Sequence, residues 1–118
     1  MTEKDILTLF RHARLLLVPV GCLYMSKGEV DRLRRQFNKS IRGVFKQTAN
    51  TNFRRYPAHH IIPLKLGGNN EATNLALVQP LLHDAIHAYM DKQILSMNPR
   101  VGSRFNVVIP MKLGALWY

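Results

Sequence analysis

The stretch "AHHIIPLKLGGNNEATNLALVQPLLHDAIH", which runs from Ala58 to His87, holds four of the five histidines of this 118-residue chain. It starts with a short run of β-forming residues, passes through the turn-forming letters GGNNEAT, and returns to the apolar run NLALVQ. This order is typical of two short strands joined by a loop. Because Pro63 interrupts the first run, we expect that strand to lie at a sheet edge or to be bulged.

A helix should follow the second strand directly. Pro80 can occupy the first turn of a helix over "PLLHDAIHAYMDKQILSM", residues 80 to 97, and the letters NPR after it would end the helix. His83 and His87 are four residues apart, so they share one face of this helix. Two histidines at that spacing are often only part of a packed or exposed helical face, so the pair alone indicates little.

Two neighbouring histidines on the first strand suggest that the helical pair belongs to a metal site. His59 and His60 are adjacent on a strand, so their side chains point to opposite faces. If the chain folds back, one of them meets His83 and His87. Three imidazole ligands would then surround a metal with at least one open position, which is the arrangement of a catalytic metal site and not of a closed structural one.

The regions on either side are expected to be mostly helical. Apolar residues recur at helical spacing from Thr2 to about Leu17, after which Pro19 and Gly21 break the pattern. A second amphipathic helix is predicted over about 27 to 47, where Ser26 and Glu29 have the spacing of a capping box. The tail from 101 to 118 alternates in "RFNVVIPM", which indicates a short strand and an irregular end.

Composition limits the class of protein. A hydrophobic content of 47% and a charged content of 20% are those of a single globular domain. Cys22 is the only cysteine, so a disulfide within the chain and a thiolate zinc site are excluded, and any metal must bind to histidines or carboxylates. The longest apolar run, LLLVPV, is too short to span a bilayer. The first residues lack the pattern of an ordinary secretory signal.

The net charge is the unusual total. Seventeen lysines and arginines against seven acids give +10 and a pI near 10.4. Such an excess favours a polyanionic partner, which can be nucleic acid, an anionic membrane surface or an acidic protein, over an ordinary basic surface. The second helix carries seven cations against two acids, and a face that tracks phosphates is as good an interpretation as a solvated one. Its cations are Lys27, Arg32, Arg34, Arg35, Lys39, Arg42 and Lys46.

The order His59-His60, Asn74, His83 and His87, with spacings of fourteen, nine and four residues, resembles the HNH nuclease motif of the ββα-metal (His-Me finger) superfamily. It is similar in particular to the nuclease domains of colicin- and pyocin-type bacterial toxins. "AHHIIP" also resembles toxin nucleases named for an Ala-His-His signature. The resemblance covers about Tyr56 to Asp91, a third of the chain.

This resemblance implies an α+β fold, a mainly helical single domain that carries a ββα-metal finger made of a β-hairpin and a helix. The N-terminal helical part would cover about 1–50, the finger about 56–97 and a C-terminal extension 98–118, all in one domain over 1–118.

The resemblance also implies the roles of the site residues. His59, His83 and His87 would hold one divalent metal, His60 would be the general base, and Asn74 would brace the finger. Three imidazoles favour Zn²⁺ or Ni²⁺, whereas Mg²⁺ prefers carboxylates and water, and Mn²⁺ is a further possibility. Arg54 and Arg55 precede the motif and could clamp the scissile phosphate, as could the basic helix through Arg34, Arg35, Lys39 and Arg42. Asp91 could orient a ligand histidine, although exposure is the simpler expectation, and His12 is expected to be structural or exposed.

The implied function is a metal-dependent, largely nonspecific DNA endonuclease that leaves 5′-phosphate and 3′-hydroxyl ends. It would be the toxin domain of a bacterial antibacterial effector, secreted by a dedicated system to act in the target-cell cytoplasm, with an acidic immunity protein as partner. A phage or mobile-element nicking endonuclease, cytoplasmic in its own cell, is one alternative. A non-catalytic, metal-stabilised DNA-binding module is the other, and the extra histidine, His60, separates it from the enzymes.

Overall fold

The computed structural model describes all 118 residues and begins with α1 (Glu3–His12). Thr2 and Asp5 form a reciprocal capping box at its start. The prediction that this helix extends to about Leu17 is wrong, because the helix ends at His12. Arg14 adopts a left-handed backbone, with φ of 61°, and the N–H of Leu15 donates to the carbonyl of Phe10 at 2.9 Å. This bond closes the helix C-terminus.

A strand that the sequence did not predict follows at once. β1 (Leu16–Leu23) pairs antiparallel with β4 (Arg104–Met111) over its full length, so the segment around 1–50 is not entirely helical. Pro19 and Gly21, taken as pattern breaks, lie inside this strand opposite Val108 and Asn106. A sheet of only two strands has an open edge on each strand, and a proline can occupy such a strand.

The basic helix is continuous across its predicted range of 27 to 47. α2 (Lys27–Gln36) starts at the N-cap Ser26 and passes through a π-helical turn (Phe37–Ile41) into α3 (Arg42–Gln47). The π turn contains an additional residue, which rotates the side chains that follow it. Val44, which follows Phe37 and Ile41 at the seven- and three-residue spacing of one face of a regular helix, is therefore 63% exposed, whereas Phe37 is buried.

The hairpin and the following helix have the predicted order. β2 (Ala58–His60) pairs antiparallel with β3 (Leu75–Val78), and α4 (Pro80–Met97) begins at the proline. The first strand is shorter than its apolar run because the chain turns after His60 and forms a short 3₁₀ turn at Leu64–Leu66. A short final strand, β5 (Leu116–Trp117), pairs parallel with β3 and completes a three-stranded sheet.

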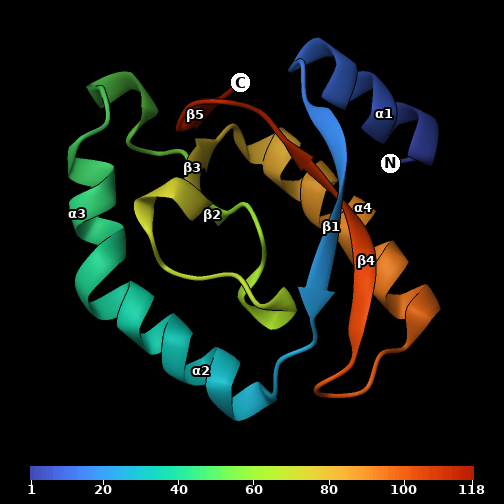
Figure 1. Cartoon of the computed structure of the whole chain (residues 1–118). Helices are drawn as coiled ribbons and strands as arrows, with labels where there is room; N and C mark the ends of the chain where they lie inside the picture. Colours follow the sequence, from blue (N-terminus) through green and yellow to red (C-terminus); the bar gives the residue numbers. More distant parts are fainter.

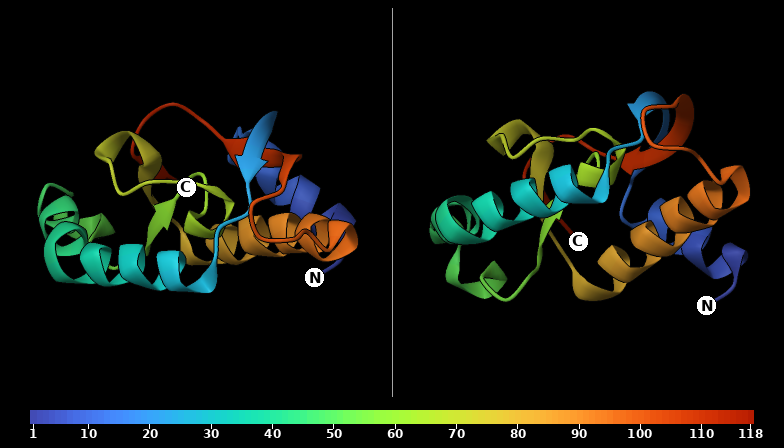
Figure 2. Two further views of the ribbon diagram at one scale, coloured as in Figure 1. Left: turned by 60° about the horizontal axis from the view of Figure 1, so that its bottom comes forward. Right: turned by 90° about the horizontal axis from the view of Figure 1, so that it is seen from below.

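The elements enclose one core (Figure 1). α4 crosses behind both small sheets and carries much of the core, while α2 and α3 border the opposite side of the hairpin (Figure 2). The buried strand and helix residues include Val78, Ile86, Val107 and Trp117. The fold is α+β, as the sequence indicated, and none of its helices has the length and apolar character needed to cross a membrane.

Candidate metal and acid-base site

Three histidines meet where β2 lies against α4. The ligand nitrogens of His59, His83 and His87 all lie within 4.8 Å of one another, and the Nε2 atoms of His83 and His87 are 2.9 Å apart. The imidazole centroid of His59 is 5.1 Å from that of His83 and 5.5 Å from that of His87. The expected ligand set is therefore brought together by the fold, and these three residues could hold a metal ion.

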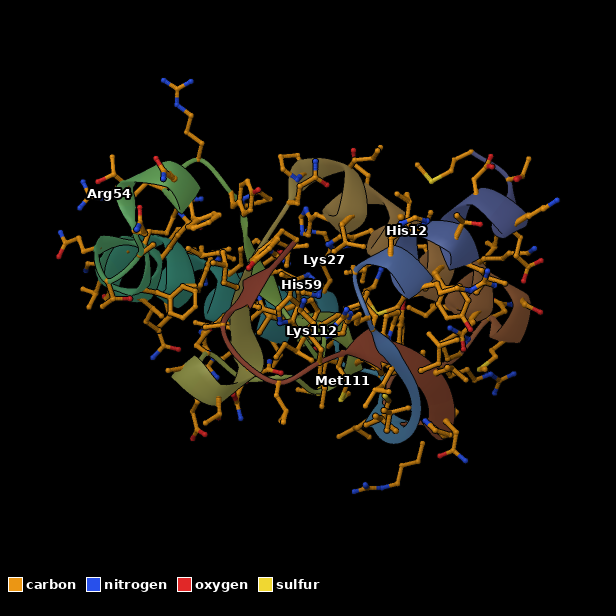
Figure 3. All side chains as sticks on the ribbon, turned by 90° about the horizontal axis from the view of Figure 1, so that it is seen from above. His12, Lys27, Arg54, His59, Met111 and Lys112 are labelled. Carbon is orange, nitrogen blue, oxygen red and sulfur yellow. The ribbon has the colours of Figure 1, made fainter.

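The state of His59 fits a metal ligand. Its side chain is 1% exposed, and neither Nδ1 nor Nε2 has a hydrogen-bond partner. A buried polar group without a partner costs roughly 1–3 kcal/mol. A metal ion would satisfy one of these two nitrogens, while the other would still lack the acceptor that ligand histidines usually have. Figure 3 shows His59 in the interior of the molecule.

Burial keeps the three imidazoles neutral, which is the form that binds metals. Desolvation, reinforced by the neighbouring His87, lowers the pKa of His83 to about 4. Desolvation also lowers the pKa of His59 well below its usual value and lowers the pKa of His87, although Asp91 and Asp84 act in the opposite direction on His87.

His60 points to the other face of β2, as expected for adjacent strand residues. Its Nε2 lies 2.8 Å from Oδ1 of Asn70, and its ring contacts Phe37 with centroids 4.5 Å apart. It shares a cavity of about 270 Å³ with the three clustered histidines. Desolvation, helped by the positive charge of Arg34, lowers the pKa of His60, although its hydrogen bond to Asn70 raises it, so the imidazole is neutral at neutral pH.

Asn74 lies at the end of a 3₁₀ turn, buried, and joins the two ends of the loop between the strands. Its Oδ1 accepts from the N–H of Ile62 at 2.9 Å, and its Nδ2 donates to the carbonyls of Ile62 at 3.0 Å and Asn69 at 2.9 Å. The side chain thus fixes the backbone two residues beyond His60. It does not line the cavity, so its position is that of a brace and not of a group that touches a substrate.

The basic side chains divide into those at the cavity and those away from it. Arg34 and Lys65 line the cavity, and Lys65 bonds Asp91 at 2.8 Å. Asp91 makes no hydrogen bond to His87. Arg54 lies instead in a separate shallow depression beside Lys46, at the outer edge of the molecule in Figure 3.

The remaining cations form an unneutralised surface. Only four of the seventeen lysines and arginines make salt bridges, two of them with the acids of α2 itself. Arg35, Lys39, Arg42 and Arg55 are exposed, have no acidic partner and do not line the cavity. His12 is exposed on α1, away from His59 (Figure 3).

Three residues of the site were missed by sequence reasoning. Asn70 was taken as turn material, Lys65 as part of a strand, and Trp117 as part of an irregular end. The indole of Trp117 lies 5.7 Å from the ring of His59. No sequence pattern links Trp117 to the histidines, whereas the GGNN letters could have identified Asn70 as a residue with a fixed place in a tight turn.

The chain matches no protein-family model, no curated protein and no solved structure. The geometry of the site and the resemblance of its histidine motif are therefore the grounds on which a function can be proposed.

Proposed function

We propose that this protein is a metal-dependent endonuclease of the HNH type that hydrolyses DNA phosphodiester bonds with little sequence preference. The observation that carries the proposal is that the two adjacent histidines of β2 have different surroundings at one cavity. His59 joins a three-histidine cluster, while His60, the next residue, is held separately at the same cavity in its neutral form. A site that only bound a metal would not need a neutral histidine, His60, held beside the metal ligands but outside the cluster.

The side chains supply the groups that phosphodiester hydrolysis requires. His60 would take a proton from a water molecule whose oxygen attacks the phosphorus, and the P–O3′ bond then breaks, leaving a 5′-phosphate and a 3′-hydroxyl. The leaving 3′ oxygen takes its proton from solvent. His59, His83 and His87 would hold one divalent ion, which supplies Lewis acidity to the phosphate and the leaving oxygen. Arg34 lines the cavity and can pair with a phosphate oxygen.

An all-nitrogen ligand set favours Zn²⁺, Ni²⁺ or a similar transition ion over Mg²⁺, with Mn²⁺ less well matched. DNA is supported as the substrate by the net charge of +10 and by the exposed cations of α2 and α3 that have no acidic partner. Contacts of this kind recognise the phosphate backbone and not the bases, which is why we propose little sequence preference.

The biological role proposed is that of an antibacterial toxin domain, with a small acidic immunity protein as partner. Its support is the resemblance of the motif to bacterial toxin nucleases and the basic surface that an acidic protein would complement. Production of the wild-type chain in a bacterial cytoplasm should degrade chromosomal DNA and stop growth. The His60→Ala variant, produced at the same level, should do neither.

The primary test uses purified protein and supercoiled plasmid with a panel of divalent ions, with and without chelator. We expect metal-dependent degradation that chelation abolishes and that His60→Ala loses by about 10²- to 10⁴-fold, the usual worth of a general base. Metal affinity and fold of that variant should be nearly unchanged. Cleavage that stops at open circles would favour a nicking enzyme. A folded, metal-loaded wild type that binds DNA without cleaving it would favour the non-catalytic binding module.

A further inference from the structure

We propose that Asn70 is a positioning residue that holds His60 in the Nε2–H tautomer and so assigns Nδ1 as the nitrogen that accepts a proton. The catalytic part of this inference rests on the proposed nuclease function, whereas the tautomer itself does not. The tautomer of His60 follows from which end of the Asn70 amide faces the histidine.

The amide orientation is determined by its other partners. Nδ2 of Asn70 lies 2.9 Å from the carbonyl oxygen of Leu33 and 3.1 Å from Oε1 of Gln36, both on α2. The Leu33 carbonyl can only accept, so the group facing it must be the NH₂. The reversed amide would put two oxygens within hydrogen-bond distance without a proton between them. Oδ1 of Asn70 must therefore face His60.

The histidine tautomer follows from this orientation. An amide oxygen has no proton to give, so the 2.8 Å contact between Oδ1 of Asn70 and Nε2 of His60 is a hydrogen bond only if Nε2 carries the proton. In the neutral ring the lone pair then lies on Nδ1. Nδ1 accepts no hydrogen bond from the protein, and although His60 is buried, Nδ1 is not among the atoms completely sealed from solvent.

The turn that carries Asn70 has little freedom to move. A Cβ on Gly68 would come within 1.8 Å of the Ile62 carbonyl oxygen, so the backbone passes where only glycine fits, and the Gly68 N–H donates to the carbonyl of Pro63 at 3.0 Å. The backbone carbonyl of the next residue, Asn69, accepts a hydrogen bond from Nδ2 of Asn74 at 2.9 Å. Asn70 thus links α2 to His60 from a fixed backbone, as orientation of a catalytic group requires. These contacts account for two of the letters in GGNN, the glycine at 68 and the asparagine at 70.

The tautomer can be tested directly, without an activity measurement. In ¹⁵N-labelled wild type at pH 7.5, both metal-free and zinc-loaded, long-range ¹H–¹⁵N correlation spectra should give His60 a protonated Nε2 and an unprotonated Nδ1. The Nε2 proton should exchange slowly enough with water to be seen. In Asn70→Ala that proton signal should disappear. A protonated Nδ1 in wild type would overturn the inference, whether or not the protein is a nuclease.

The catalytic part is tested by a double-mutant cycle in plasmid cleavage. Asn70→Ala should lower the rate by more than about 10-fold but by less than loss of the base itself, which is worth about 10²–10⁴-fold. It should leave zinc affinity unchanged and have no further effect in a His60→Ala background. Asn69→Ser, in the same turn, is the matched control: it removes an amide but keeps a side-chain oxygen that can accept from the N–H of Glu71, as Oδ1 of Asn69 does at 3.0 Å, and it should keep the wild-type spectrum and rate.

Each outcome of the cycle has one meaning. If Asn70→Ala slows cleavage equally with and without His60, its effect is structural and the positioning role is wrong. If the wild type does not cleave DNA at all, the proposed function fails, and the spectra still decide whether Asn70 sets the tautomer.

Discussion

Trp117, the second-last residue of the chain, lies against His59, with ring centroids 5.7 Å apart and an interplanar angle of 60°. It is fully buried, and its Nε1 donates to the carbonyl of Gly114 at 3.0 Å. The strand that carries it, β5, pairs with β3 beside the hairpin. The end of the chain is therefore a wall of the histidine cluster.

We predict that Trp117→Ala weakens both the fold and the metal site. Loss of a buried indole costs about 3–5 kcal/mol, and the cavity it leaves admits water beside His59. Trp117→Phe keeps an aromatic ring, so it should lose less stability and less zinc affinity than Trp117→Ala. Urea unfolding and zinc titration of the two variants measure the effects. Zinc affinity in Trp117→Ala equal to that of wild type would mean that the wall does not support the site.

The ligand set predicts which histidines zinc binding needs. His59→Ala, His83→Ala and His87→Ala should each lower zinc affinity by about 100-fold or more, since even residues that only support a ligand are worth about 10–100-fold. His12→Ala, an exposed histidine on α1, is the matched control and should bind zinc as wild type does. Isothermal titration calorimetry in a buffer that binds zinc weakly is the measurement. Equal affinities across all four variants would exclude the cluster as the site.

The metal-free protein should lose stability in mild acid. The folded-state pKa of His83 is about 4, and those of His59 and His87 are lowered as well, whereas an unfolded histidine titrates near 6.5. As the pH falls below about 6.5 the unfolded chain binds more protons than the folded one, so the free energy of unfolding falls toward pH 4.

Urea unfolding of chelator-treated protein at pH 7.5, 6.0 and 5.0 checks this. The denaturation midpoint should be highest at pH 7.5 and lowest at pH 5.0, and the decline should be smaller in His83→Gln, which lacks one of the titrating groups. A midpoint that rises toward pH 5.0 would contradict the buried, neutral state of the cluster.

The sequence predicted the parts of this protein that local patterns determine. α4 has the predicted bounds because Pro80 and the letters NPR mark its ends. Helix periodicity places His83 and His87 on one face, and strand periodicity separates His59 from His60, but only the resemblance to the HNH motif selected His59 as the third member of the cluster. β1 was missed because its evidence is not local. Pro19 and Gly21 are unfavourable for a strand but do not exclude one. The strand forms only because it pairs with β4, more than eighty residues away in the sequence.

Arg34 should contact the DNA backbone at the site, whereas Arg54 should not. Arg34 lines the cavity, and its charge lowers the pKa of His60 and of His87, whereas Arg54 lies beside Lys46 at the outer edge of the molecule. In a His60→Ala background, which should bind DNA without cleaving it, Arg34→Ala should reduce the slope of log affinity against log salt by about 1. Arg54→Ala should change it less. Equal changes would assign both arginines to a general basic surface.

The tight turn of the finger should not tolerate a side chain at Gly68. A Cβ there would lie 1.8 Å from the Ile62 carbonyl oxygen and 2.9 Å from that of Pro63, and both are backbone atoms that cannot rotate away. Gly68→Ala must therefore displace the loop that Asn74 and Asn70 hold, so we expect a loss of several kcal/mol, above the usual 0.5–3 kcal/mol range of single substitutions. Gly28→Ala on α2, where a Cβ meets nothing within 4 Å, should instead be neutral or gain up to about 1 kcal/mol. Thermal unfolding of both variants measures this, and a Gly68→Ala protein as stable as wild type would show that the turn has room to move and does not fix the groups beside His60.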